Sequence, residues 1–113
     1  MVEALLSKPR LEDTRMEDLK IDLLPLKKAA LVLRAINHKL RLQILKLINQ
    51  HGKLTVTEIY VKLRLEQSVA SQHLAILRRA GYVTTERDGK FIFYSVNHER
   101  LAEIQQLSKS LIA

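Results

Sequence analysis

Small hydroxyl and carboxamide side chains are clustered between residues 66 and 80. They are Gln67, Ser68, Ser71 and Gln72. Such groups are short enough to approach base edges and phosphates closely, and a glutamine carboxamide can form two hydrogen bonds with one adenine. The chemistry that these residue types favour is non-covalent recognition of a DNA groove. A solvated surface helix also has a polar outer face, so this segment alone leaves both interpretations open.

One α-helix is expected to carry these side chains. Its apolar positions recur at i, i+4 and i+7, which places them on one face of a 3.6-residue repeat and assigns that face to the core. These positions are Ala70, Leu74 and Leu77. Arg78 and Arg79 suit the negative end of the helix dipole and extend the set of candidate DNA contacts. Gly81 is the expected left-handed C-terminal cap, so we predict a helix over residues 66–80.

A β-hairpin is predicted directly after this helix. Residues 82–87 and 90–96 are rich in valine, threonine, isoleucine and aromatic residues, and the Asp-Gly pair at 88–89 is a strong signal for a short turn that joins them. Arg87 and Lys90 then stand at the tip, where contact with phosphates or a minor groove is natural. A charged tip also serves solubility. We favour phosphate contact because the tip follows a candidate reading helix.

Two further helices are predicted upstream. Residues 55–58, Thr-Val-Thr-Glu, fit a capping box that opens a helix over residues 56–63. Arg64 and Leu65 then make a tight connection, so this helix and the polar helix form a helix-turn-helix. The helix before them has an apolar stripe of Leu40, Ile44, Leu47 and Ile48. We expect Asn37 to be its N-cap.

The chain resembles the winged helix-turn-helix of the ArsR family of bacterial transcriptional repressors over residues 36–96. The resemblance lies in the runs INHKLRLQILKLI and LTVTEIYVKLRLEQSVASQHLAILRRAGYVTTERDGKFIFYSV. It implies that residues 66–80 enter the major groove, that the hairpin flanks them and that the outer helices pair two subunits. By this resemblance, bases and backbone are contacted by Gln67, Ser68, Ser71 and Gln72, and the wing contacts come from Arg87 and Lys90. Glu66 and Arg64 depart from the hydroxyl residue and the glycine that the family often has at these positions.

The terminal segments have more apolar surface than one small domain needs. A helix is expected over residues 23–36, and another from Asn97, a plausible N-cap, to nearly the last residue. We expect a dimer interface formed by Leu26, Ala30, Leu33, Leu101, Ile104, Leu107 and Leu111. The alternative is that these helices pack only on the core or on each other. A two-fold dimer has a functional logic, because it places two reading helices one duplex turn, ~34 Å, apart on a palindromic site.

The predicted fold class is mainly α with a small β-hairpin, a winged helix-turn-helix with terminal dimerisation helices. A chain of 113 residues allows one domain. We divide it into a partly helical N-terminal arm, residues 1–22, and a DNA-binding and dimerisation domain, residues 23–113. The arm carries four basic and six acidic side chains, so its net charge is −2. Because the formal charge of the whole chain is +7, the domain carries +9. A polyanion partner, most often nucleic acid, fits this charge, although solvated lysines alone also produce it.

Several function classes are disfavoured. With no cysteine, thiol redox sensing and thiolate metal ligation are excluded. His98, Glu99 and Glu103 lack a second histidine one turn away, so no metal or cofactor is expected. His73, beside the apolar Leu74, is interpreted as a partly buried structural histidine. No phosphate loop or nucleophile motif supports an enzyme.

Two hypotheses from different classes follow. The first is a homodimeric, sequence-specific transcriptional regulator, expected to repress by occluding a promoter. The second is a winged-helix module that binds proteins, with an incidental basic surface. Arginine at the helix end and on the wing favours the first, because a protein-binding version would expose aromatics or leucines on the polar helix. No apolar run approaches the ~20 residues that span a bilayer and no signal peptide is apparent, so the expected compartment is the cytoplasm.

Overall fold

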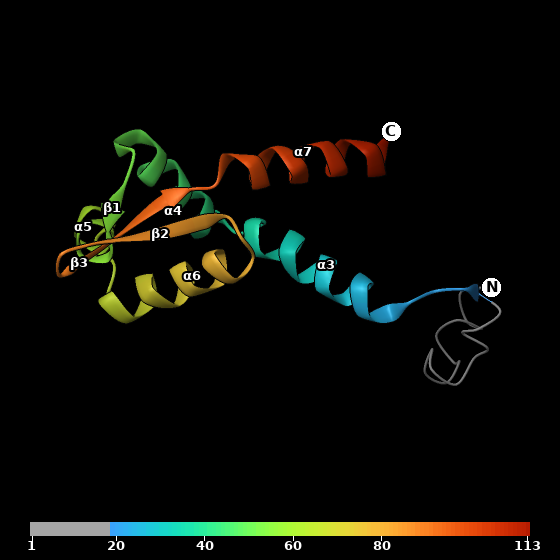
Figure 1. Cartoon of the computed structure of the whole chain (residues 1–113), viewed down its shortest axis with the longest axis horizontal. Coiled ribbons are helices and arrows are strands. Elements are labelled where there is room, and N and C mark those ends of the chain that lie inside the picture. Colours follow the sequence, from blue (N-terminus) through green and yellow to red (C-terminus); the bar gives the residue numbers. More distant parts are fainter. Residues whose placement is uncertain (1–18) are drawn as a thin grey trace.

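The computed structural model describes residues 19–113, and this part contains five α-helices and a three-stranded antiparallel sheet (Figure 1). The helices are α3 (Leu23–Ile36), α4 (Lys39–His51), α5 (Val56–Leu63), α6 (Gln67–Arg79) and α7 (His98–Ile112), and the strands are β1 (Leu54–Thr55), β2 (Val83–Asp88) and β3 (Phe91–Val96). Helices α4, α5 and α6 and the sheet form one body, from which α3 and α7 project to the same side (Figure 1). Residues 1–18 of the predicted arm lie outside the described residues. The predicted fold class is confirmed.

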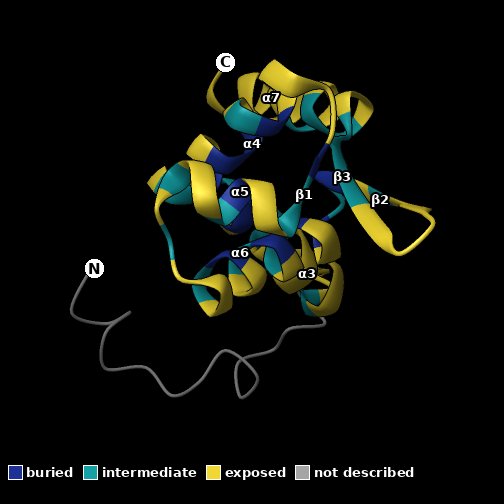
Figure 2. Ribbon diagram, turned by 90° about the vertical axis from the view of Figure 1, so that its left-hand side faces the viewer, coloured by how far each residue is buried: buried dark blue, intermediate teal, exposed yellow. Residues whose placement is uncertain are grey.

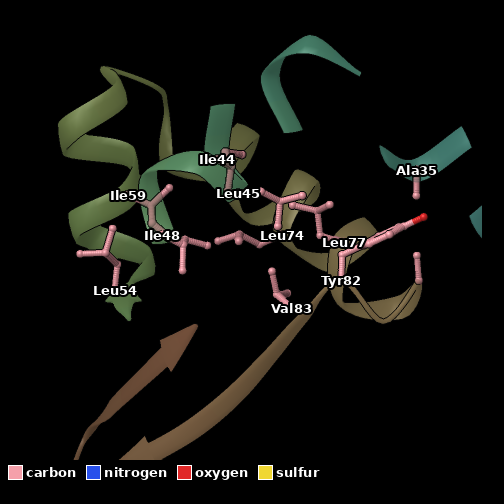
Figure 3. Packing of buried hydrophobic residues seen from close by; sticks show 11 residues of the cluster. Ala35, Ile44, Leu45, Ile48, Leu54, Ile59, Leu74, Leu77, Tyr82 and Val83 are labelled. Carbon is pink, nitrogen blue, oxygen red and sulfur yellow. The ribbon is translucent and has the colours of Figure 1, made fainter. Parts of the chain in front are cut away.

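The core lies where α4, α5, α6 and the sheet meet. Figure 2 shows the buried residues on the inward sides of these elements, and Figure 3 shows their packing. The predicted apolar stripes supply much of this core: Ile44, Ile48, Ala70, Leu74 and Leu77 are almost fully buried. Tyr82 is also fully buried, and its hydroxyl donates to the carbonyl oxygen of Val32 in α3 at 2.7 Å. Burial raises the pKa of this hydroxyl, which keeps it a neutral donor.

The sheet has one strand more than the sequence predicted. Strand order is β1-β3-β2, and the short β1 pairs Leu54 with Tyr94. A two-residue strand has no periodicity of its own, so only its long-range pairing reveals it. The hairpin turn also lies one residue further on than predicted, since Asp88 still pairs with Phe91. Gly89, at φ +63°, holds the first central position, where a type II′ turn needs a positive φ.

The starts of two helices follow the predicted signals, and the start of a third departs from them. At α5, the Thr55 hydroxyl accepts from the Glu58 amide and the Glu58 carboxylate accepts from the Thr55 amide, so the capping box is confirmed. The predicted Asn97 cap of α7 is also present. The Asn37 prediction is wrong: His38 is the N-cap of α4, and its Nδ1 accepts from the backbone amide of Leu40. Asn37 is already the C-cap of α3, because the two helices are separated by only two residues.

Arg64 and Glu66, the two departures from the family pattern, both lie in the connection between α5 and α6. Arg64 adopts the left-handed conformation at φ +55°, which costs a residue with a Cβ roughly 1–2 kcal/mol. Glu66 is the N-cap of α6 and makes no side-chain cap hydrogen bond. At the other end of α6, Gly81 has φ +87°, and a Cβ there would lie 2.8 Å from Nε of Arg100. The predicted end of the helix at Gly81 is therefore confirmed. Gly81 also lies close to the Arg100 side chain of α7, which leaves no room for a Cβ.

Candidate nucleic-acid interface

The outer face of α6 carries all the polar residues singled out in this segment. We define the reading surface as Gln67, Ser68, Ser71, Gln72, Ala75, Arg78 and Arg79, all of which are exposed. Ser68, Gln72 and Arg79 lie in one row at i, i+4 and i+11, and the other residues flank this row. Between Gln67 and Arg79 the sequence has no acidic residue. The surface therefore offers hydrogen-bonding groups and two cations without a carboxylate that would repel phosphates.

The wing, β2 and β3 with their connecting turn, lies at the same end of the molecule as the first turn of α6. Figure 1 shows both at the end opposite to the free tips of α3 and α7, and Figure 2, viewed onto this end, shows the wing to one side of α6. Arg87 and Lys90 are exposed at the tip, as predicted. The Arg87 guanidinium donates to the Gly89 carbonyl oxygen at 3.3 Å. A groove occupied by α6 would bring phosphates close to this tip.

The outer face of the wing carries a cluster that the sequence analysis missed. Phe91 is 51% exposed, and its ring centroid lies 6.3 Å from that of Phe93. The Lys53 ammonium lies 4.8 Å from the Phe93 centroid and 3.5 Å from the Glu86 carboxylate. Lys53 reaches the wing because it precedes β1, which pairs with β3. The wing thus includes a cation, Lys53, from outside the hairpin, and no local pattern indicates this.

A buried arginine holds α6 against the end of α3. Arg41 of α4 is 9% exposed, and its guanidinium donates to the backbone carbonyls of Ala35 and Arg34 in the last turn of α3. These carbonyls lie at the negative end of the helix dipole, which stabilises the cation. Arg41 also contacts Nδ1 of His73 in α6 at 3.1 Å. One side chain therefore joins three helices, and it fixes the position of the helix that carries the reading surface.

His73 is neutral in this arrangement. A guanidinium can only donate, so Nδ1 of His73 accepts and the ring proton lies on Nε2. The pKa of His73 is lowered, first by burial and then by two basic neighbours, His38, whose ring centroid is 4.9 Å away, and Arg41. This agrees with the structural role expected for His73.

The residues predicted for the dimer interface differ in exposure. Leu101 and Ile104 are half-buried and pack against the core, whereas Leu107 and Leu111 are 43% and 67% exposed. On α3, Leu26 is exposed, and Ala30 and Leu33 are half-buried. The single chain does not test whether a second copy covers them, so the interface stays a prediction.

Within residues 19–113, no three His, Asp or Glu side chains gather in an arrangement that could hold a metal ion. No helix in the same range is both long and apolar enough to cross a membrane.

Similarity to known proteins agrees with this geometry. The profile of a family described as bacterial regulatory protein, arsR family, matches residues 38–85, from the N-cap of α4 to the first half of β2. The transcriptional activator HlyU of Vibrio cholerae is 38% identical over 80 residues, and the match covers 71% of this chain and 73% of HlyU.

Two solved structures share the fold. The crystal structure of the transcriptional repressor PagR of Bacillus anthracis is 34% identical with a TM-score of 0.61, and the match covers 76% of this chain and 98% of PagR. A solution structure from Mycobacterium bovis, described as a homodimeric winged helix-turn-helix DNA-binding domain, is 30% identical with a TM-score of 0.62 and coverage of 77% and 80%.

Proposed function

The chain belongs to the arsR family of bacterial regulatory proteins, and from this premise we propose a homodimeric repressor that recognises its operator through α6. It is a winged helix-turn-helix transcriptional regulator that binds DNA. We propose further that residues 23–113 act as one DNA-binding and dimerisation domain.

The observation that carries this proposal is the composition and exposure of the reading surface. Its members are solvent-exposed and, apart from Ala75, polar or cationic. None carries a carboxylate, and the wing tip lies at the same end of the molecule. The carboxamides of Gln67 and Gln72 are proposed to read base edges, with Ser68 and Ser71 on bases or backbone. Arg78 and Arg79 at the helix end, with Arg87 and Lys90 on the wing, are proposed to contact phosphates.

Dimerisation through α3 and α7 completes the mechanism. The exposed leucines on these helices support it, as does the homodimeric relative from Mycobacterium bovis. Two copies related by a two-fold axis would present two reading surfaces to adjacent major grooves, which suits a palindromic operator.

Repression is proposed over activation for a physical reason. The relatives include a protein named as a repressor and one named as an activator. A bound dimer that covers a promoter blocks access by occupancy alone, whereas activation needs a further contact with the transcription machinery. We therefore propose occlusion, without catalysis and in the cytoplasm.

The protein-binding module is the less favoured alternative. Its hot spots would be exposed aromatics or leucines on the outer face of α6. That face instead carries glutamine, serine, alanine and arginine.

The test is a titration of the full chain against genomic fragments selected by binding, with random duplex as the control. We expect at least ~10³-fold preference for the selected site, and a steep negative slope of log affinity against log salt. A shallow slope with no preference would instead support the protein-binding module.

A further inference from the structure

A cavity of about 570 Å³ lies between α3 and the second half of α6. Its apolar wall includes Leu31 and Val32 of α3 and Ile76 of α6. The volume is within the range of sites that bind small molecules, roughly 300–1,000 Å³. The cavity lies beside the reading surface and is not part of it, except that Arg79 borders both.

All the charged residues that line the cavity are basic. Lys28 and Arg34 contribute from α3 and Arg79 from α6, and no described Asp or Glu is among the lining residues. Cations around an apolar wall attract a ligand with an anionic group and an apolar body. A neutral ligand would form no ion pair with these cations.

Arg41 adds a buried cation to the same wall. Its guanidinium has five N–H groups, and its named acceptors are two backbone carbonyls and the neutral His73. In the described part of the chain, no carboxylate forms an ion pair with it. A buried charge without a counter-charge is costly, so an anion placed here gains more than it would at an exposed arginine.

We propose that this cavity is an effector site for an amphipathic carboxylate, an aliphatic or aryl acid with a single anionic head. The head pairs with the cations of the wall, the buried Arg41 and the exposed Lys28, Arg34 and Arg79. The apolar body packs on Leu31, Val32 and Ile76. The charge complementarity of the wall selects this class of ligand.

The position of the site gives the ligand a regulatory effect, and this part rests on the proposed function. The cavity is lined both by α3, a proposed dimerisation helix, and by α6, the reading helix. Arg41 on its wall forms hydrogen bonds with both helices. A ligand that alters the angle between α3 and α6 alters the separation of the two reading surfaces in the dimer. Ligand and operator then change each other's affinity by the same factor, typically 5- to 150-fold.

Decanoate is the probe and decanol its neutral control, both titrated into the full chain by calorimetry without DNA and below micelle formation. We expect saturable decanoate binding, and binding of decanol weaker by about tenfold, the equivalent of one ion pair lost in a partly buried site. Lys28→Glu should weaken decanoate binding by at least that factor. Lys27→Glu is the matched control, because Lys27 is exposed next to it and does not line the cavity.

A second variant tests the apolar wall. Leu31 is 60% exposed, so Leu31→Glu should fold, and its carboxylate should compete for the cations and abolish binding. Leu24 lies two turns earlier on the same helix face and is equally exposed, so the Leu24→Glu variant should bind decanoate as the wild type does. Circular dichroism and sedimentation check the fold and the dimer in each variant.

Three results would overturn the site: no saturable binding of decanoate, equal binding of decanol, or equal effects of the Lys27 and Lys28 variants. The first would also be the result if a second copy of the chain covers the cavity. Because these measurements contain no DNA, loss of the proposed function would leave decanoate binding intact. Conversely, operator binding unaffected by saturating decanoate would remove the regulatory role and leave the site.

Discussion

The guanidinium of Arg41 lies 3.1 Å from Nδ1 of His73, so a buried cation is hydrogen-bonded to an imidazole that must stay neutral. This contact connects the start of α4 to the middle of the reading helix. Protonation of His73 would place two positive charges in contact and remove the acceptor of the hydrogen bond.

Stability should therefore fall on acidification. The folded pKa of His73 is lowered, while in the unfolded chain it is about 6.5, so the unfolded state binds more protons between these values. The difference between the two pKa values of His73 makes its full contribution to the free energy of unfolding above pH ~6.5. This contribution is lost as the pH falls toward the pKa of His73 in the folded chain. Urea unfolding at pH 7.5 and at lower pH measures this.

His73→Asn is the variant for that prediction, because its amide oxygen can accept from Arg41 without titrating. The pH dependence should flatten in this variant and persist in His98→Asn, which alters an exposed histidine at the start of α7. A His73→Asn protein as acid-sensitive as the wild type would disprove the assignment.

The capping box gives a second prediction. Thr55→Ala removes the hydroxyl that accepts from the Glu58 amide, and should lower the free energy of unfolding by about 1 kcal/mol. Thr57→Ala, exposed within the same helix, should be neutral or slightly stabilising because alanine is the better helix former. Denaturant unfolding of both variants checks the difference, and equal losses would show that the cap contributes nothing.

The dimer interface gives a third prediction. Leu107→Asp places a charge on the exposed apolar stripe of α7 and should dissociate the dimer, since burying an unpaired carboxylate is costly. Gln106→Asp introduces the same charge one residue away, at an exposed polar position, and should leave the dimer intact. Sedimentation equilibrium distinguishes them. An unchanged dimer in Leu107→Asp would remove this stripe from the interface.

A fourth prediction concerns the wing. Lys90→Ala should weaken binding to operator and random duplex alike, and should reduce the magnitude of the salt slope by about 1, because a phosphate contact has no sequence preference. Lys109→Ala, in the last turn of α7 at the other end of the molecule, is the control. A loss confined to the operator would mean that Lys90 reads bases.

Local signals predicted most of the helices and their ends. Apolar spacing placed the buried faces of α4 and α6, and the Thr55–Glu58 and Asn97 caps depend only on residues within one turn. The His38 cap was missed because histidine is an unusual N-cap and Asn37 carried the stronger signal. Asn37 is instead the C-cap of α3, which ends at Ile36 as predicted, so the N-cap of α4 falls on His38.

Features that depend on distant residues could not be predicted. β1 exists because Leu54 pairs with Tyr94, and Lys53 reaches Phe93 for the same reason. The contact of Arg41 with His73 spans 32 residues, and the cavity needs the relative position of α3 and α6. The candidate DNA contacts on α6 could be predicted from the sequence because they all lie on a single helix, whose repeat places them on one face.

The most direct test of sequence reading by α6 compares Gln72→Ala with the wild type on operator and on random duplex, by fluorescence anisotropy at one salt concentration. We expect a loss of about 1–3 kcal/mol on the operator and little change on random duplex. Gln105→Ala, exposed on α7, should change neither. Equal losses on both duplexes, or no loss on either, would contradict the assignment of α6 as the reading helix.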